Sequence, residues 1–227
     1  MAAKLSVVAT PIGNLEDITL RALRTLKEAN VIYCEDTRTT AKLLGRYDIH
    51  TPMKRLDANL ETAKLKEVVN RLVAGERVAY VTDAGTPGIS DPGYRLVAGV
   101  RQALGDSFTI EAIPGPSAVA AALSIAGMPA DHFVFFGFPP HKKGRQTLMK
   151  EIAATKVTAV LYESSHRILK LLGELAAAVP ERQLAVVREV TKKFEEVQIG
   201  TASQIQSFFE EYPEHQRGEF VVVVEGE

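Results

Sequence analysis

The sequence contains few of the features that mark secreted, membrane-spanning or metal-binding proteins. Among its 227 residues there is a single cysteine, Cys34, so no disulfide can form within the chain, and its apolar neighbours predict a buried, unreactive thiol. No apolar run reaches the roughly 18 to 20 residues that cross a bilayer, and the first ten residues lack the apolar core of a signal peptide. These absences predict a soluble, cytoplasmic protein.

A strong net charge is also missing, since 27 basic residues stand against 28 acidic ones. No global positive field favours nucleic acid, so any such contact must come from local basic clusters. The sequence shows no cysteine and histidine spacing typical of zinc, no Walker loop and no G-x-S-x-G elbow. Metal, nucleoside-triphosphatase and serine-hydrolase chemistry are therefore not expected.

What the sequence does contain is an alternation of short β-branched runs with segments of helical periodicity, which predicts an α/β fold. We expect largely parallel strands in the first half and a mixed sheet with antiparallel pairs in the second, where several strands follow closely. The expected strands are residues 5–9, 31–34, 77–82, 108–112, 133–138, 158–162, 183–189, 195–200 and 219–225. The expected helices are residues 18–29, 40–44, 61–74, 94–104, 117–126, 145–154, 167–178 and 202–212.

The stretch Ile113-Pro114-Gly115-Pro116 is the most plausible seam between two domains, because two prolines and a glycine in four residues interrupt any helix or strand. We place one domain at residues 1–115 and the other at residues 116–227. Ser117 could cap the helix that follows, could contact a ligand, or both, because a helix N-terminus offers free N–H groups.

Two loops of the first half follow predicted strands. Residues 9–15 (ATPIGNL) stand where ligands dock on parallel sheets, but they do not match the G-x-G-x-x-G pattern and are equally well explained as an ordinary turn. Residues 81–93 (VTDAGTPGISDPG) are more informative, since three glycines and two prolines make a rigid loop that lets backbone approach a ligand. We expect a ligand role for Asp83 and Gly85, and a helix-capping role for Asp91.

Three polar segments stand out in the second half. Residues 161–167 (LYESSHR) gather an acid, two hydroxyls, an imidazole and a guanidinium; for His166, a catalytic role and a capping or surface role both stay open. Residues 188–196 (REVTKKFEE) bring charge to a strand end, with a solvated hairpin as the alternative. Residues 141–145 (HKKGR) form a basic cluster that is either a solvated loop or a grip on phosphates.

Taken in order, the segments ATPIGNLEDIT, CEDTR, VTDAGTPGISDPGY, IPGPSAV, GFPP, YESSHR, REVTKKFEE and RGEFVVVVEG resemble the small-subunit ribosomal RNA methyltransferases of the tetrapyrrole methylase superfamily. The resemblance covers essentially the whole chain. It implies two α/β domains with S-adenosylmethionine in the cleft between them, methylation of a cytidine ribose 2′-hydroxyl in 16S rRNA, and a homodimer. Superfamily members that act on corrins and porphyrins usually have a glycine-rich first loop, so TPIGN at this place favours the RNA branch.

The resemblance also implies which residues act. Cofactor contacts are expected from Pro11, Asp83, Ala84, Gly85, Ile89, Ser117, Ala118, Leu161 and Tyr162, and from the stretch around Arg217 and Gly218. Methyl transfer from a sulfonium to a weakly acidic hydroxyl needs in-line geometry and a proton acceptor. The unranked candidates for that base are Glu35, Asp36, Asp83, Glu163, His166 and Glu189, with Arg38, Arg167 and Lys192 available for phosphate or for lowering the pKa of the hydroxyl.

The accessible 2′-hydroxyl that such chemistry requires implies a nucleotide splayed from its helix or presented in an assembled small ribosomal subunit. Relatives typically continue past RGEFVVVVEG into a small helical domain that we expect to help hold RNA, whereas this sequence ends at Glu227. Two other functions stay open: methylation of a small tetrapyrrole-like molecule with the same cofactor, and a non-catalytic module that binds RNA or a ligand.

Overall fold

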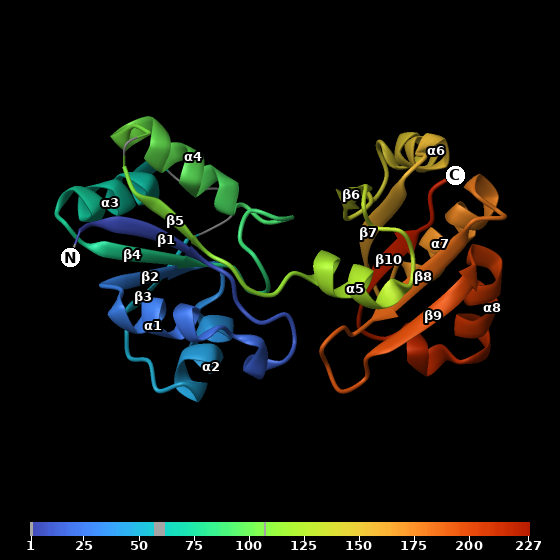
Figure 1. Cartoon of the computed structure of the whole chain (residues 1–227), viewed down its shortest axis with the longest axis horizontal. Coiled ribbons are helices and arrows are strands. Elements are labelled where there is room, and N and C mark those ends of the chain that lie inside the picture. Colours follow the sequence, from blue (N-terminus) through green and yellow to red (C-terminus); the bar gives the residue numbers. More distant parts are fainter. Residues whose placement is uncertain (1, 57–61, 107) are drawn as a thin grey trace. The chain divides into compact units, whose positions relative to one another are not determined.

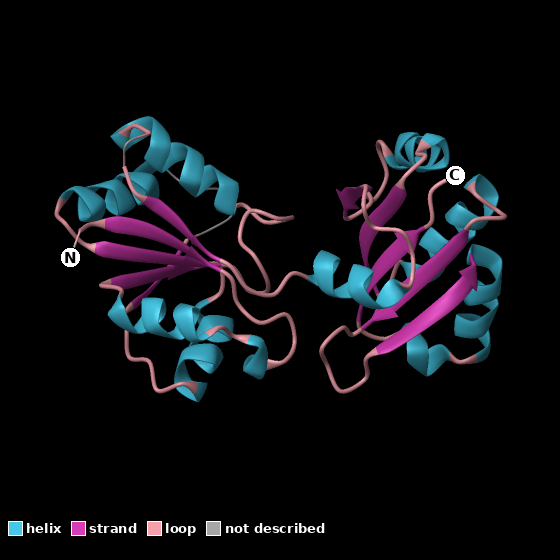
Figure 2. Cartoon of the chain, in the orientation of Figure 1, coloured by secondary structure: helices cyan, strands magenta, loops and turns pink. Residues whose placement is uncertain are grey.

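The computed structural model describes residues 2–56, 62–106 and 108–227, which divide into two compact units, Met1–Ser117 and Ala118–Glu227. Each unit is built on one five-stranded sheet, and each sheet carries helices (Figures 1 and 2). The division follows directly after the proline- and glycine-rich stretch at residues 113–116.

The first unit is a parallel sheet with the strand order β3-β2-β4-β1-β5, in which every neighbouring pair is parallel. Its elements, in chain order, are β1 (Lys4–Val8), the 3₁₀ helix η1 (Leu15–Asp17), α1 (Leu20–Glu28), β2 (Val31–Cys34), α2 (Thr37–Arg46), β3 (Met53–Arg55), α3 (Thr62–Val73), β4 (Arg77–Val81), α4 (Gly93–Leu104) and β5 (Ile110–Ile113). The predicted parallel α/β arrangement of this half is confirmed.

Helices cover both faces of this sheet because its strands are apolar on both sides. Successive strand residues point to opposite faces, so Ile32 and Cys34 join the cluster beneath α1 and α2, while Val31 and Tyr33 join the cluster beneath α3 and α4. Burying each such side chain contributes roughly 1.5–3 kcal/mol. Continuous apolar strands such as VIYC therefore settle in the middle of the unit, and the carboxyl ends of the strands are left to polar loops.

The second unit has a mixed sheet with the order β6-β7-β10-β8-β9. Its elements are α5 (Ala118–Ala126), β6 (Phe133–Gly137), α6 (Arg145–Ala154), β7 (Thr158–Ser164), α7 (Ile168–Ala178), β8 (Gln183–Arg188), β9 (Glu196–Thr201), α8 (Ala202–Glu211), the 3₁₀ helix η2 (Pro213–Gln216) and β10 (Glu219–Val224). Only β6 and β7 pair in parallel among the described strands, and the other three pairings are antiparallel. The predicted mixed sheet is confirmed.

The two faces of the second sheet carry different helices. Along β10, Val222 and Val224 belong to the cluster beneath α6, α7 and α8, whereas Val221 and Val223 belong to the cluster beneath α5. The helix α8 begins at a capping box in which Thr201 and Gln204 exchange side-chain and backbone hydrogen bonds. The strictly apolar run FVVVV is thus buried on both sides.

Several element boundaries differ from the predictions for identifiable reasons. The short edge strand β3 was not expected; it pairs with β2. The expected helix over residues 18–29 begins only at Leu20, after Thr19 accepts a hydrogen bond from the N–H of Ala22. The expected helix over residues 40–44 begins at Thr37, because Asp36 caps it. The start of the helix expected over residues 61–74 lies outside the described residues.

Cys34 is fully buried in β2, and burial raises the pKa of its thiol, as expected for an unreactive cysteine. None of the helices in the described part of the chain is long and apolar enough to span a membrane. Within the same described residues, no group of three or more histidine, cysteine or acidic side chains is placed to hold a metal ion.

Candidate active site

In the first unit, four loops leave the carboxyl ends of parallel strands at one edge of the sheet, which is where ligands bind in open α/β sheets. The loops after β1 and β4 are joined by a backbone pair, since Thr10 and Gly85 donate their N–H groups to each other's carbonyl at 2.9 and 3.1 Å. The loop after β5 joins them through the hydroxyl of Thr86, which donates to the carbonyl of Pro116 at 3.0 Å. The three loops therefore form one cross-linked rim.

Gly85 stands where these loops converge. Its φ of +81° lies in the left-handed region, and a Cβ added there would lie 3.3 Å from Cγ2 of Ile12 and 3.6 Å from the carbonyl oxygen of Pro116. A side chain at this position would be strained and crowded. Neighbouring Asp83 and Ala84 are exposed, and Pro11, next to Thr10 in the loop after β1, is buried. The rim thus offers backbone and one exposed carboxylate, with no bulky side chain at residue 85.

A second set of polar groups follows β2, the strand beside β4. The N–H of Asp36 donates to Oδ1 of Asp83 at 3.0 Å, which ties the two loops together. The carboxylate of Asp36 accepts from the guanidinium of Arg38 at 2.7 Å and from its backbone N–H at 2.8 Å. These hydrogen bonds lower the pKa of Asp36 to about 2, so this carboxylate is a weak proton acceptor.

Glu35 differs from Asp36 in its surroundings. It is half-buried, and burial raises the pKa of its carboxyl group; the nearby charges of Asp91 and Asp83 raise it further. A hydrogen bond from the hydroxyl of Thr82 opposes this rise without cancelling it. Glu35 is therefore a better proton acceptor than Asp36 at the same edge.

Asp91 holds the far end of the β4 loop. Its Oδ2 accepts from the N–H groups of Gly88 and Ile89 at 2.7 and 3.1 Å, and its Oδ1 accepts from Gly93, the first residue of α4, at 2.7 Å. Asp91 is not the N-cap that the sequence predicted: that position belongs to Pro92, and Asp91, one residue earlier, binds the first N–H of the helix through its side chain. Ile89, which is 42% exposed, is thereby fixed at the rim.

In the second unit, the polar segments noticed in the sequence meet at a single sheet edge. The strands β6, β7 and β8 end there and the antiparallel strands β9 and β10 begin there, as the pairing of Ser164 with Glu219 and of Arg188 with Phe220 shows. This edge, which we call the strand-end edge, carries residues 138–144, 165–167, 189–195 and 217–218. In Figure 1 the connection between β8 and β9 extends beyond the strand ends.

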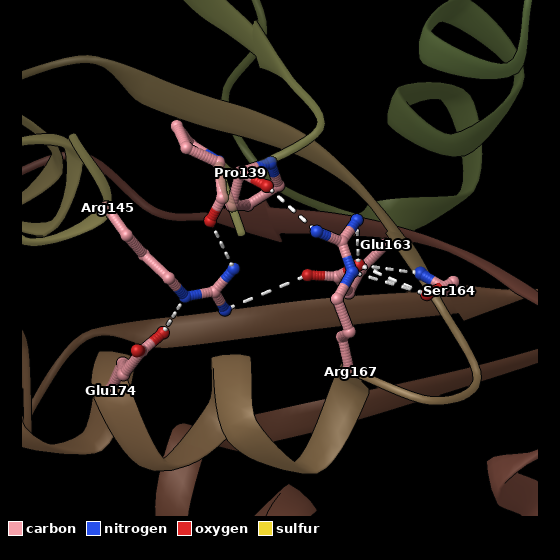
Figure 3. Close-up of polar contacts among 7 residues, drawn as sticks. Pro139, Arg145, Glu163, Ser164, Arg167 and Glu174 are labelled. Carbon is pink, nitrogen blue, oxygen red and sulfur yellow. Dashed lines mark hydrogen bonds and ion pairs between the residues drawn. The ribbon is translucent and has the colours of Figure 1, made fainter. Parts of the chain in front are cut away.

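Glu163, at the end of β7, lies in a buried ion network (Figure 3). Its side chain has no exposed surface, and its Oε1 accepts from the N–H of Ser164 at 2.8 Å and pairs with Nη2 of Arg167 at 2.7 Å. Its Oε2 lies 3.8 Å from Nη2 of Arg145. Those two atoms, Oε2 and Nη2, have no hydrogen-bond partner, and the carboxylate is enclosed between the guanidinium groups of Arg145 and Arg167.

The two arginines of this network hold the loop that follows β6. Arg167 donates to the carbonyl of Pro139 at 3.0 Å, and Arg145 donates to the carbonyl of Pro140 at 3.1 Å and to Glu174 at 2.7 Å. Arg145 is only 3% exposed, so the expected basic cluster at residues 141–145 is corrected: its last member is not a solvated cation. The hydrogen bond to Glu174, 29 residues away in the sequence, holds Arg145 in this buried position.

Leu161 and Tyr162 point to opposite faces of β7. Leu161 is fully buried in the cluster beneath α6, α7 and α8, so a cofactor can contact only its backbone. The ring of Tyr162 packs edge-on against Phe135 at 4.9 Å and near Phe138. Burial raises the pKa of Tyr162, and the N–H of Val119 in the first turn of α5 lowers it, which places the hydroxyl beside the start of that helix.

Glu189 and Gly218 contact each other at the strand-end edge. Oε1 of Glu189 accepts from Nζ of Lys192 at 2.7 Å and from the N–H of Glu219 at 3.0 Å. Burial raises the pKa of Glu189, but these hydrogen bonds outweigh it and the net pKa is lowered. Gly218 has a φ of +107°, and a Cβ there would lie 2.6 Å from Glu189, so only glycine fits.

The structure thus gathers the residues predicted from the sequence into two sets. The first unit brings together Pro11, Glu35, Asp36, Arg38, Asp83, Ala84, Gly85 and Ile89. The second unit brings Tyr162, Glu163, Arg167, Glu189, Lys192 and Gly218 to its strand-end edge, with His166 and Arg217 exposed there and Ala118 at the start of α5. Sequence reasoning missed Thr82 and the ion-paired role of Arg145.

The chain matches a known protein family over most of its length. The family model described as Tetrapyrrole (Corrin/Porphyrin) Methylases matches residues 4–206. The solved structure of the methyltransferase CobJ superposes with a TM-score of 0.73 at 20% identity, covering 99% of this chain and 95% of that one. The uroporphyrin-III C-methyltransferase of Thermus thermophilus, complexed with S-adenyl homocysteine, has a TM-score of 0.63 at 19% identity, covering 97% and 96%. The fold is therefore that of the tetrapyrrole methylases.

One curated relative narrows the assignment. The protein named "Ribosomal RNA small subunit methyltransferase I" of Thermotoga maritima is 40% identical over 223 residues, which cover 98% of each chain. This chain belongs to the ribosomal RNA small subunit methyltransferase I family, within the tetrapyrrole methylases.

Proposed function

We propose that this chain transfers the methyl group of S-adenosylmethionine to the ribose 2′-hydroxyl of a cytidine in 16S ribosomal RNA. The observation that supports this most directly is the 40% identity over nearly the whole chain to a protein named for methylation of small-subunit ribosomal RNA. Similarity to the corrin and porphyrin enzymes is about half as high in identity and concerns the fold alone. The RNA substrate is therefore favoured over a tetrapyrrole.

The residues present are suited to S-adenosylmethionine. At Gly85 a Cβ would fill the space where the loops after β1, β4 and β5 converge, so backbone lines the rim there. Asp83 keeps one carboxylate oxygen without a bond to the N–H of Asp36, and an exposed carboxylate is a partner for an amino or hydroxyl group. We propose that the cofactor contacts are Pro11, Asp83, Ala84, Gly85, Ile89, Ser117, Ala118, the backbone of Leu161, Tyr162 and Gly218.

When bound, the cofactor supplies an electrophilic methyl group on a sulfonium sulfur. What the chain itself must do is align the ribose hydroxyl and accept its proton. We assign proton acceptance to Glu35, because burial raises its pKa whereas Arg38 keeps that of Asp36 near 2. Asp36 and Arg38 then serve as a positioning pair at the same rim.

The candidate carboxylates of the second unit are already bound by basic side chains. Glu163 is enclosed by Arg145 and Arg167, and Glu189 is bound by Lys192. We propose that both act as positioning residues, which hold the loops of the strand-end edge. His166 is exposed at this edge and remains the second candidate for handling the proton.

Three finer features complete the proposal. The resemblance of the whole chain to its family supports an assembled small ribosomal subunit as the substrate, a cytoplasmic site of action and a homodimer. One chain has a mass of 24.7 kDa, and sedimentation of the purified protein should give twice that mass for the dimer.

The proposal is tested by offering three acceptors with radiolabelled donor: small ribosomal subunits lacking this methylation, free 16S rRNA, and a porphyrinogen. We expect label in the subunits and none in the macrocycle. Label in the macrocycle and none in the RNA would replace the RNA proposal by the tetrapyrrole one. Donor binding without transfer to any acceptor would favour a non-catalytic module.

A further inference from the structure

The hairpin that joins β8 to β9 carries an aromatic ring that the fold does not bury. Phe194 is 61% exposed, although Val190 and Val197 on either side of it pack against the cluster beneath α5. The hairpin extends past the strand ends in Figure 1. A single exposed apolar ring is common on protein surfaces, so the exposure of Phe194 gains meaning only together with the turn that presents the ring and the charge beside it.

The turn that presents this ring is rigidly built. The N–H of Lys192 donates to the carbonyl of Glu189 at 2.9 Å, that of Glu195 donates to the carbonyl of Lys192 at 3.1 Å, and that of Thr191 donates to Oε2 of Glu195 at 2.5 Å. Two non-glycine residues, Glu189 and Thr191, hold φ values of 50° and 68°. Such left-handed backbone is unfavourable and persists only where its surroundings enforce it. The backbone of the turn is therefore pre-organised, which lowers the entropic cost of binding at its tip.

Charge at the turn is divided unequally between two lysines. Lys192 is neutralised by Glu189 and Glu219, each at 2.7 Å. Lys193 is exposed, with its Nζ 5.5 Å from the centre of the Phe194 ring. Over the described ranges, no acidic group lies within ion-pair distance of Lys193. The tip thus presents an aromatic face beside one cation that no acid neutralises.

An aromatic face beside a cation is the combination by which proteins hold unpaired RNA, since the ring stacks on a base and the cation meets a phosphate. We propose that Phe194 stacks on an unpaired base of the RNA substrate while Lys193 contacts the adjoining phosphate. The inference rests on the proposed RNA substrate and adds a base-stacking contact outside the residues assigned to cofactor and chemistry.

The chain has no tryptophan, so Phe194→Trp introduces a single fluorescent reporter at the tip. Titration with oligocytidylate should quench its emission, because a stacked base lies against the indole. Ile199→Trp is the matched control, since Ile199 lies on β9 of the same hairpin and is 62% exposed. We expect no quenching at residue 199. Equal quenching at both positions, or none at residue 194, would overturn the stacking contact.

Methyl transfer to small ribosomal subunits gives a second readout. Phe194→Ala should lower kcat/KM by about 5- to 150-fold, the loss expected for one stacked base, mainly through KM. Phe194→Tyr should restore most of it, and the Kd for S-adenosylmethionine should stay unchanged in both variants. Normal kcat/KM in Phe194→Ala, with an active wild type, would refute the inference and leave the proposed function intact.

An inactive wild type would instead refute the proposed function, and the fluorescence titration would still decide whether the tip stacks on RNA. A second copy of the chain is the alternative partner for the exposed ring of Phe194. Light scattering separates the two: loss of dimer mass in Phe194→Ala, with RNA affinity unchanged, would overturn the RNA contact.

Discussion

Replacing Glu163 by glutamine keeps the shape of the side chain and removes its charge from the buried network. The carboxylate accepts from Ser164 and pairs with Arg167 at 2.7 Å, and Arg145 lies 3.8 Å away. Breaking a buried ion pair by removing one partner costs about 3–5 kcal/mol. Because Glu174 continues to pair with Arg145, we expect the lower end of this range, about 3 kcal/mol. For a chain of this size that lowers Tm by roughly 6–12 °C.

The assay is thermal and urea unfolding followed by circular dichroism. Glu28→Gln is the matched control, because Glu28 pairs with Arg77 at 3.0 Å but its side chain is 46% exposed, and loss of such a surface pair costs at most about 1 kcal/mol. If Glu163→Gln were as stable as wild type but inactive in methyl transfer, Glu163 would be a proton acceptor and its positioning role would be wrong.

Three further predictions concern the first unit. Gly85→Ala should weaken S-adenosylmethionine binding about tenfold or more by calorimetry, because the added Cβ would enter the rim 3.3 Å from Ile12, where we assign backbone to the cofactor. Gly105→Ala carries the same left-handed strain, with a φ of +80°, but nothing lies within 4 Å of its Cβ, so it should leave binding unchanged. Equal effects would argue against a cofactor role for Gly85. Glu35→Gln should lower the single-turnover rate by about 10²–10⁴-fold with donor affinity retained, and an unchanged rate would show that another group accepts the proton. Hydrogen bonding to Lys54 lowers the pKa of Glu67 from 4.5 to about 2. Glu67 therefore contributes stability that is fully present above pH 4.5 and is lost as the pH falls toward 2. Acid unfolding of Glu67→Gln should therefore be flatter between those pH values than that of wild type, and identical slopes would show that this ion pair adds no stability.

The main elements could be predicted because their signal is local. The buried strands VIYC and FVVVV stand out as continuous apolar runs, the helix over residues 145–154 by the spacing of its apolar residues, and the mixed second sheet by its closely spaced strands. The edge strand β3 could not be found this way. It has three residues, two of them charged, and only its pairing with Ile32, Tyr33 and Cys34 of β2 makes it a strand.

The loops of the site could be predicted from the sequence, but the contacts between residues distant in the sequence could not. Glycine and proline mark residues 81–93 as a special loop, and chain order alone places it after a strand. The hydrogen bond from Asp36 to Asp83 spans 47 residues and depends on β2 lying beside β4, which periodicity does not reveal. Likewise, Arg145 reads as part of an exposed basic run, and its burial depends on Glu163 and Glu174, both distant in the sequence.

The most direct test of the proposed reaction identifies the product atom. Small ribosomal subunits from cells lacking this methylation are incubated with the protein and tritiated S-adenosylmethionine, and the RNA is then digested and its nucleosides are separated. We expect label in 2′-O-methylcytidine, at a linkage that resists alkaline cleavage because its 2′-oxygen is blocked. Label confined to a base-methylated nucleoside, or no label despite confirmed donor binding, would contradict the proposed reaction.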